Sequence, residues 1–462
     1  MTTAERDEIL RALCDALPPA RVVVEEGVLA RLARDALHPA RLPEAARTVR
    51  PLCVVCPQST AEVAAVVRVA NATRTPLIPM GGGSGLMGGA ATVTPGIVLD
   101  LRGLQAIRIR PADRMAEVGA GVTIKALNEA AAPYRLMCGH DPWTVAVATV
   151  GGTIATNSLG YLGGKYGAMG DQVLGMEVVL PTGEVLVTRA VEKASTGPGL
   201  HRLFVGAEGC LGIITHATLR LFPLPQARRL QGWEFPDFDT GFAAIQALFD
   251  AGLQPALLDY GDDDPSPAGD PPAALMLGFE GPQRVTEAEA AEAAALCRQH
   301  RGRLLPQRRV ETFWEHRHLI GDAYAEARAS GKPWHERRPL LDFLHVALPP
   351  SAVPAYRRQC LQRLFERRLH VHQTGLWVYA GLFSVVYSGA DVATLAAVHG
   401  ELLELCHQAQ GAMEYCHGVG LRLAPFMARE HGVGLEVLRR LKRSLDPLGI
   451  LNPGKLGLNG TA

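Results

Sequence analysis

Short apolar runs bounded by glycine, proline or polar residues recur through the first half of the chain, and this pattern predicts β-strands. The runs are 51–57, 75–78, 97–100, 115–121 and 215–222. Two further runs, 173–181 and 183–187, predict a hairpin, because the Pro181-Thr182-Gly183 between them is typical of a tight turn. The first half is therefore expected to be rich in short strands.

Apolar residues at helical spacing predict helices at 61–72, with an N-cap at Ser59, and at 122–132, with Thr123 as a possible N-cap. In the second half, strand-like runs alternate with longer helical ones. These longer helices are predicted at 242–251, 285–300 and 352–367. The apolar run 376–387 predicts one buried strand, because it is too short for a membrane-spanning helix.

A chain of 462 residues is too long for one ordinary hydrophobic core, so two or three domains are expected. The first 50 residues are helical in pattern and rich in alanine, leucine and arginine, as in a lead-in segment. The pattern changes again after Pro225. The predicted parts are 1–50, 51–225, 226–410 and 411–462.

Charge and composition argue against several classes of function and location. Lysine plus arginine and aspartate plus glutamate both number 46, so the formal net charge is zero and no basic surface for nucleic acid is expected. The N-terminal sequence lacks the pattern of a secretory signal, and no run approaches about 18 uninterrupted apolar residues. The sequence therefore predicts a cytoplasmic protein without a transmembrane segment.

The nine cysteines are scattered along the chain. Cys53 and Cys56 have the spacing of a redox or zinc site, but they lie in a strand-like run without a second pair at metal-ligand distance. Buried, reduced thiols are expected.

Three stretches of small residues separate the short strands, at 79–90, 139–160 and 206–214. The first reads PMGGGSGLMGGA. Glycine at this density lets the backbone close on a ligand and turn successive N–H groups toward one anion, such as a pyrophosphate. The loop has no Gly-Lys-Ser/Thr ending and no long amphipathic helix after it, which argues against a Walker or Rossmann loop. A flexible turn remains the alternative for this loop alone, whereas the three stretches together suggest one extended ligand.

Six segments, in the family's order, resemble flavoproteins of the vanillyl-alcohol oxidase and p-cresol methylhydroxylase (PCMH) type. The similar subgroup contains D-lactate and glycolate dehydrogenase flavin subunits and alkylglycerone-phosphate synthase. The segments are CPQSTAEVAAVVRVA (56–70), PMGGGSGLMGG (79–89), ATVGGTIATN (148–157), KYGAMGDQVLGMEVVLPTGEV (165–185), LFVGAEGCLGIIT (203–215) and LKRSLDPLGILNPGK (441–455).

The resemblance implies an α+β fold with a PCMH-type FAD-binding domain, built from two α+β sub-domains, at 51–225. It implies a cap domain with an antiparallel sheet covered by helices at 226–410, and a C-terminal segment, 411–462, that returns to the flavin site. Family members that bind the flavin covalently often use a histidine in or near the first glycine loop. This loop contains none, so non-covalent FAD is expected.

The resemblance also assigns residues to the cofactor. Residues 79–85 would hold the pyrophosphate, 143–149 with 156–159 would line the flavin, and 208–214 would flank the dinucleotide. The candidates are Pro79, Met80, Gly81, Gly82, Gly83, Ser84, Gly85, Trp143, Thr144, Thr149, Gly152, Thr156, Asn157, Ser158, Glu208, Gly209, Gly212, Ile213 and Ile214.

The chain mixes two patterns within the subgroup. Its ILNPGKL ending and the Trp314-Glu315-His316-Arg317 element look like the 2-hydroxy-acid dehydrogenases. Those enzymes usually carry His-x-Gly-Asp-Gly-Asn-x-His, which supplies metal-binding histidines, but HVHQTGLWVYAG (370–381) lacks the Asp-Gly-Asn core, so no metal site is predicted. The GHDPW start of the second stretch looks like the synthase, whose three-histidine run keeps only His417 here.

His417, followed by Gly-Val-Gly, is the candidate catalytic base, since imidazole titrates near neutral pH and can accept a hydroxyl proton. A histidine hydrogen-bonded in a loop is the alternative. Neither glycine loop is expected to contact His417. Arg317 could bind a carboxylate or a phosphate through two hydrogen bonds, or belong to a structural ion pair. The second His-Gly-Val-Gly element, at His431, is expected to lie at a helix end.

The leading hypothesis is an FAD-dependent dehydrogenase or oxidase that acts on a small 2-hydroxy acid or related alcohol, with hydride transfer to flavin N5. The electron acceptor is unspecified. One alternative is a synthase-like flavoprotein without net redox chemistry. Another is a flavin-binding subunit of a larger complex of the glycolate-oxidase type. The alternatives for assembly are a homodimer and a complex with an iron–sulfur subunit.

Overall fold

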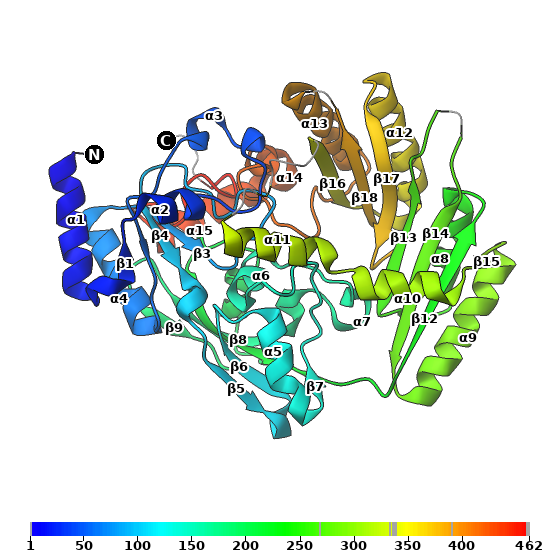
Figure 1. The fold of residues 1–462 in the computed structure, drawn as a ribbon, viewed down its shortest axis with the longest axis horizontal. Helices are drawn as coiled ribbons and strands as arrows, with labels where there is room; N and C mark the ends of the chain where they lie inside the picture. Colours follow the sequence, from blue (N-terminus) through cyan, green and yellow to red (C-terminus); the bar gives the residue numbers. More distant parts are fainter. Residues whose placement is uncertain (1, 268, 332–333, 335–339, 390, 459–462) are drawn as a thin grey trace.

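A computed structural model describes residues 2–267, 269–331, 334, 340–389 and 391–458. Strands β1–β11 and the first helices form one body, and strands β12–β18 with their helices form a second body beside it (Figure 1). The C-terminal residues cross back to the first body. This mixed arrangement confirms the predicted α+β class.

The first sheet has the strand order β1-β2-β4-β3. β2 and β3 both pair with β4 in parallel, and β2 and β4 are buried on both faces, as parallel strands usually are. Helix α4 covers the sheet with an apolar face, and the Ser59 hydroxyl caps it by accepting the N–H of Glu62. The elements are α1 (Thr3–Ala16), β1 (Val22–Val23), α2 (Glu26–Leu32), α3 (Glu44–Arg47), β2 (Cys53–Val55), α4 (Thr60–Thr73), β3 (Leu77–Met80) and β4 (Ile97–Asp100).

The second sheet is antiparallel, with the order β5-β6-β10-β8-β9, and β8 and β9 form the predicted hairpin. Its strands share one apolar core with the first sheet. Thr123 caps α5 as the sequence pattern suggests, by accepting the N–H of Ala126. The elements are β5 (Ile107–Arg110), β6 (Met115–Gly119), α5 (Ile124–Ala131), β7 (Leu136–Met137), α6 (Val150–Thr156), α7 (Gly163–Tyr166), β8 (Val173–Val179), β9 (Val185–Val187), β10 (Ile213–Arg220) and β11 (Phe222–Pro223).

The second body is built on an antiparallel sheet with the order β15-β12-β14-β13-β17-β18-β16, which confirms the expected cap architecture. Helices α8, α9, α12 and α13 cover one face of it (Figure 1). The elements are β12 (Ala227–Phe235), α8 (Phe238–Asp250), β13 (Leu257–Asp263), β14 (Ala273–Gly281), α9 (Gln283–Gln299), β15 (Arg303–Leu304), α10 (Gln307–His316), α11 (Leu319–Ser330), β16 (Leu341–Ala347), α12 (Val353–Glu366), β17 (His370–Trp377), β18 (Leu382–Ser388) and α13 (Val392–Gln408).

The prediction of one buried strand over 376–387 is wrong. The run contains the end of β17 and most of β18, which pair antiparallel after a reversal at 378–381. Val378 takes a left-handed conformation there, with a φ of 68°. An apolar turn between two apolar strands leaves no polar signal in the sequence, which explains the error.

Two other interpretations need correction. The loop-like stretch 139–160 contains a helix, α6, whose small residues allow close packing, since a Cβ at Gly151 would lie 2.7 Å from the Cβ of Ala120. The segment 1–50 is mostly helical, but its strand β1 pairs with β2 and extends the first sheet.

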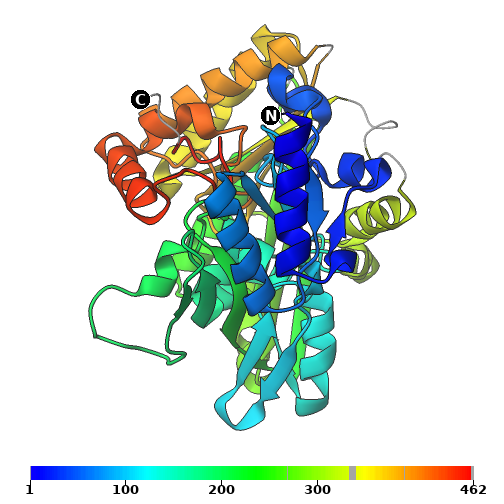
Figure 2. The same cartoon turned by 90° about the vertical axis from the view of Figure 1, so that its left-hand side faces the viewer.

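The C-terminal segment, with α14 (Met427–His431) and α15 (Val433–Leu445), returns to the first sheet (Figure 2). Leu77 of β3 donates its N–H to the carbonyl of Ile450, at 2.8 Å. The buried Lys442 ammonium lies between the Asp446 carboxylate and the carbonyls of Cys210 and Leu451. These bonds join residues far apart in sequence at one place.

Glu208 makes a second connection to this segment. Its carboxylate is buried and accepts the backbone N–H groups of Val419, at 2.6 Å, and Gly420, at 2.9 and 3.1 Å. Burial raises the pKa of Glu208 to about 7, although these two N–H donors oppose the shift.

Replacing Glu208 by alanine is expected to destabilise the fold by about 2–4 kcal/mol, because two buried N–H groups would lose their acceptor. Glu208→Gln keeps one acceptor oxygen and should lose less. Because the native pKa lies above the unfolded value of 4.5, the protonated group stabilises the native state at low pH. This stabilisation is lost as the pH rises toward 7, and Glu208→Gln should remove that slope.

Urea unfolding at several pH values measures both effects. The exposed Glu129→Ala in α5 serves as the control and should match the wild type. Equal stability of Glu208→Ala and Glu129→Ala would contradict the role given to the buried carboxyl.

Candidate active site

The first glycine stretch leaves β3 and packs directly on the second. A Cβ at Gly81 would overlap the hydroxyl oxygen of Thr149, and a Cβ at Gly82 would overlap the carbonyl oxygen of Val147. Only glycine permits backbones to approach this closely. Ser84 is held from the same side, since the Thr144 hydroxyl donates to its oxygen at 3.4 Å.

The backbone N–H groups of residues 82–87 have no acceptor among the hydrogen bonds of the described residues. Gly83 has a φ of 68°, so the chain here takes a left-handed conformation that suits glycine. Consecutive unpaired N–H groups on such a backbone form a concave anion site. The predicted pyrophosphate residues therefore have the donors that a pyrophosphate needs.

The surroundings of Gly83 differ from those expected for a pyrophosphate loop. Its Cβ position is filled by the guanidinium of Arg328, rather than by the open space of a phosphate cradle. A side chain at Gly83 would thus displace Arg328 as well as strain the backbone.

The second stretch places its predicted residues around helix α6. Thr149 caps the helix by accepting the N–H of Gly152 at 3.3 Å, and Asn157 ends it with a φ of 49°. The hydroxyl of Thr156 bonds back into the helix, and that of Ser158 contacts the Nε2 of buried His140 at 2.9 Å. Burial lowers the pKa of His140 to about 4, so this imidazole is neutral.

The third stretch packs on the first. A Cβ at Gly209 would lie 2.8 Å from the ring of Pro79, and one at Gly212 would lie 2.6 Å from Val178. Ile213 and Ile214 are buried at the start of β10. Of the residues predicted to flank the dinucleotide, Glu208 directs its carboxylate to the C-terminal segment.

The three stretches thus meet around one backbone concavity with unpaired donors. This arrangement fits the diphosphate of a dinucleotide, and the exposed Trp143 offers an aromatic ring near the cap, where it contacts Trp377 edge-on at 6.5 Å between ring centroids. The residues present fit FAD.

His417 lies in a half-buried nest of rings and one carboxylate. Its ring centroid is 4.6 Å from that of His345 and 5.2 Å from that of Phe343. Its Nδ1 lies 3.5 Å from the carboxylate of Glu414 and makes no hydrogen bond in the described structure. Burial lowers the pKa of His345 to about 3, so that imidazole is uncharged at neutral pH.

Glu414 shapes the loop that carries His417. One carboxylate oxygen accepts the N–H groups of Tyr415 at 3.0 Å, Cys416 at 2.7 Å and His417 at 3.0 Å. Burial opposes ionisation of Glu414, but the neighbouring His417 lowers its pKa overall. An ionised carboxylate therefore lies beside the proposed base.

His345, Glu414 and His417 are close enough together to hold a metal ion, with their ligand atoms within 4.8 Å of one another. The exposed group of Asp264, His370 and His372 has the same property. In the first group, the Glu414 oxygen nearest His417 already accepts three backbone N–H groups.

Arg317 is paired within the protein. Its Nε donates to Asp141 at 2.9 Å, its Nη1 donates to the carbonyl of Trp314 at 2.6 Å, and its guanidinium lies 3.6 Å from the centroid of the Trp314 ring. Asp141 also contacts the Nε2 of His318 at 2.9 Å. Despite burial, hydrogen bonding from His318 and the charge of Arg317 hold the pKa of Asp141 below its usual range.

Residues next to His417 contact the glycine stretches, whereas the hydrogen bond of His417 itself in the described structure goes to Glu414. Besides the bonds to Glu208 of the third stretch, Leu421 donates its N–H to the carbonyl of Met87 in the first, at 2.9 Å. The Cys416 thiol lies 3.6 Å from the carbonyl of Leu159 in the second. Gly418 and Gly420 permit this approach, because a Cβ there would meet Glu208 or the backbone of Met87, and no local sequence pattern predicts these partners.

His345 and Asp259 belong to the site but were not predicted. Both lie on the face of the cap sheet opposite its helices, and Asp259 is paired in register with Trp377. The Asp259 carboxyl makes no hydrogen bond or ion pair in the described part of the chain, and burial raises its pKa to about 7. Period-two alternation with the core positions 258 and 260 could have indicated its face.

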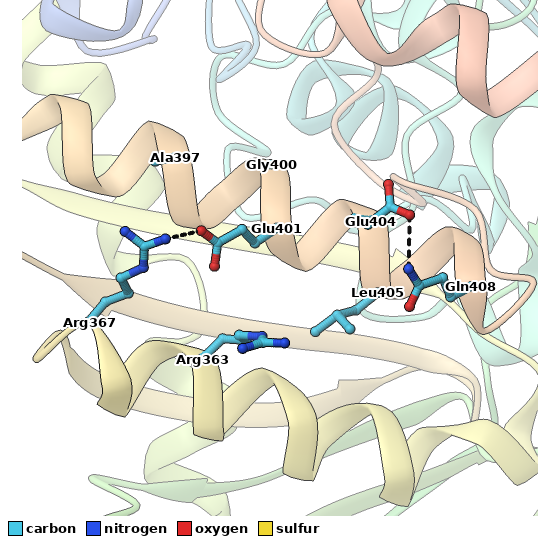
Figure 3. Close-up of a pocket in the computed structure, with 8 residues that line it drawn as sticks. All are labelled: Arg363, Arg367, Ala397, Gly400, Glu401, Glu404, Leu405 and Gln408. Atoms are coloured by element: carbon cyan, nitrogen blue, oxygen red, sulfur yellow. Dashed lines mark hydrogen bonds and ion pairs between the residues drawn. The ribbon is translucent and has the colours of Figure 1, made fainter.

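A surface hollow is lined by residues of α12 and α13 and the residue that follows α12 (Figure 3). Arg367 pairs there with Glu401, and Gln408 donates to Glu404 at 2.9 Å. Its lining contains no histidine, cysteine, serine or lysine, so the hollow carries no functional assignment. No helix of the described residues combines the length and apolarity needed to cross a membrane.

Comparisons with known proteins agree with this geometry. Residues 51–189 match the FAD binding domain, and residues 224–456 match the C-terminal domain of FAD linked oxidases. The chain is 30% identical to a probable mitochondrial D-lactate dehydrogenase of Danio rerio, over 88% of this chain and 84% of that protein. It is 27% identical to glycolate oxidase subunit GlcD of Bacillus subtilis, over 88% and 89%.

A third relative is alkyldihydroxyacetonephosphate synthase of Trypanosoma brucei brucei, 25% identical over 88% of this chain and 73% of that protein. The crystal structure of p-cresol methylhydroxylase with substrate bound has the same fold, with a TM-score of 0.80, 19% identity, and coverage of 100% of this chain and 99% of that one. The chain therefore belongs to the FAD-linked oxidase family, with FAD as its cofactor and a fold of the p-cresol methylhydroxylase type.

Proposed function

We propose that the protein is an FAD-dependent dehydrogenase or oxidase that acts on the CH–OH group of a small 2-hydroxy acid or related alcohol. The observation that carries this proposal is the placement of His417 next to an ionised carboxylate, in a segment whose neighbouring residues contact all three glycine stretches. Relatives named as D-lactate dehydrogenase and glycolate oxidase subunit support the substrate class.

Oxidation of an alcohol requires removal of the hydroxyl proton while the C–H bond faces the acceptor. When bound, FAD supplies the hydride acceptor at flavin N5. His417 takes the hydroxyl proton, and the neighbouring Glu414 carboxylate stabilises the imidazolium that forms. His345 packs against the ring and restricts its orientation.

Arg317 is assigned to bind the substrate carboxylate, and it would do this while its ion pair with Asp141 stays intact. That pair and the stacking on Trp314 hold the guanidinium in one orientation, so that a substrate carboxylate would complete an existing network. We propose that the reaction needs no divalent metal, because residues 370–381 lack the Asp-Gly-Asn core of the metal-binding motif.

A synthase-like reaction without net redox is the second candidate. It is favoured by the Gly-His-acid-Pro start of the second stretch and by the similarity to alkyldihydroxyacetonephosphate synthase. Membership of a larger complex with an iron–sulfur subunit is the third, since one relative is named as a glycolate oxidase subunit. We further propose a cytoplasmic location.

Anaerobic mixing with a panel of D-2-hydroxy acids and related alcohols tests the redox proposal. At least one compound should bleach the oxidised flavin absorbance, with or without a chelator. A flavin that stays oxidised with every compound, while the protein exchanges the acyl group of an acyl-dihydroxyacetone phosphate, would favour the synthase. Bleaching that requires added zinc or manganese would contradict the metal-free proposal.

Gly83→Val should abolish retention of FAD, because a branched Cβ disfavours a φ of 68° and overlaps the Arg328 guanidinium. FAD released into the supernatant by acid precipitation measures this loss. Wild-type protein should release all its FAD, since the link is non-covalent. Gly252→Val, at a positive φ in a cap turn where a Cβ meets nothing within 4 Å, is the control and should keep its FAD.

Full FAD content in Gly83→Val would contradict the pyrophosphate assignment. Flavin that remains in the acid pellet of the wild type would show a covalent link.

His417→Ala should reduce the rate of flavin reduction by roughly 10²–10⁴-fold, the usual contribution of a positioned general base. Rapid-mixing kinetics on FAD-loaded protein measures it. Because the backbone of residues 419–421, rather than the imidazole, contacts the glycine stretches, FAD content should be unchanged. His431→Ala, at the exposed end of α14, should behave as wild type.

An equal loss in the two histidine variants would exclude His417 as the base. A raised KM with unchanged kcat would assign it to substrate binding.

A further inference from the structure

Helix α11 of the cap lies across the first and second glycine stretches (Figure 1). The Tyr324 hydroxyl donates to the carbonyl of Gly83 at 2.5 Å. Gly321 approaches the backbone of Trp143 so closely that a Cβ would overlap its carbonyl oxygen. The helix therefore contacts the cofactor loops directly, although it belongs to the other body of the molecule.

One turn after Tyr324, Arg328 places its guanidinium against Gly83. Its Nη1 donates to the Tyr324 hydroxyl at 3.2 Å and its Nη2 lies 3.5 Å from the sulfur of Met80. Its Nε is buried and has no hydrogen-bond partner in the described structure. No carboxylate of the described residues forms an ion pair with it.

A half-buried guanidinium without a counter-charge is costly, because burial removes water that would otherwise stabilise the charge. Arginine has a planar fork of N–H donors that matches phosphate oxygens. The unpaired N–H groups of residues 82–87 include that of Gly83, the glycine that Arg328 contacts. The cation and the anion site thus meet at one residue.

Charged side chains also lie near residues 89–91, beyond the unpaired N–H groups. Asp35 accepts the N–H of Ala90 at 3.3 Å, and the Glu208 carboxylate lies 3.3 Å from the Cβ position of Gly89. Lys455 is the cation of this buried group, and its Nζ donates to the carbonyl of Ala91 at 2.6 Å. Two acids and one amine leave no spare positive charge for a diphosphate.

We propose that Arg328 is the counter-charge of the FAD pyrophosphate, supplied by the cap across the boundary between the two bodies. Cofactor binding and docking of α11 are then linked, because the diphosphate holds a residue of the cap to a loop of the first body. The FAD-binding stretches alone would make an incomplete site.

The test uses apoprotein stripped of FAD and compares Arg328→Gln with the wild type. Arg328→Gln should raise the Kd for FAD and for ADP, which keeps the diphosphate, by roughly 10–100-fold. Binding of riboflavin, which has no phosphate, should be unchanged. The variant should also show a weaker dependence of FAD affinity on salt, since one charge pair is absent.

The matched control is Arg309→Gln in α10, an exposed arginine of the preceding helix, which should leave all three affinities unchanged. Arg328→Lys keeps the charge without the fork and should fall between Arg328→Gln and wild type. If Arg328→Gln does not fold, the affinities of Arg328→Lys are compared with those of the wild type instead.

Unchanged affinity for FAD and ADP in Arg328→Gln would overturn the proposal. An equal loss for riboflavin would also overturn it, because it would show that Arg328 acts through packing of α11 rather than through charge.

Discussion

The contact between the first and second glycine stretches is the constraint on which the site depends. Gly81 has no side chain where it meets the Thr149 hydroxyl, and Gly82 has none where it meets the Val147 carbonyl, so the two loops lie in direct contact. That approach fixes the path of residues 82–87 and leaves their N–H groups free for an anion. A single added methyl group at either glycine would separate the two loops and change the shape of the whole concavity.

Local signals in the sequence were sufficient for most elements. Ser59 and Thr123 marked helix starts because their hydroxyls cap α4 and α5, and the turn at Pro181-Thr182-Gly183 marked the β8–β9 hairpin. The glycine stretches were recognised because dense glycine has few structural explanations. The strand over 376–387 was misread because its reversal uses Val378 in a left-handed conformation, a choice that tertiary contacts impose.

The site was harder to predict, because its residues act through partners that are remote in sequence. Arg317 was identified as a guanidinium for a carboxylate, but its partner Asp141 lies 176 residues away. His345 joins His417 only because β16 is the edge strand of the cap sheet and faces the C-terminal segment. Arg328 carried no motif, and only the packing of α11 on Gly83 reveals it.

The return of the C-terminal segment sets the order in which the molecule can be assembled during synthesis. Strand β3 and the first glycine stretch leave the ribosome long before Leu421, Ile450 and Lys455, which bond to them or to their neighbours. A nascent chain that has completed the cap still lacks the partners of Leu77, Met87 and Glu208. The contacts that the C-terminal segment makes with the glycine stretches can therefore form only when synthesis of the chain is nearly complete.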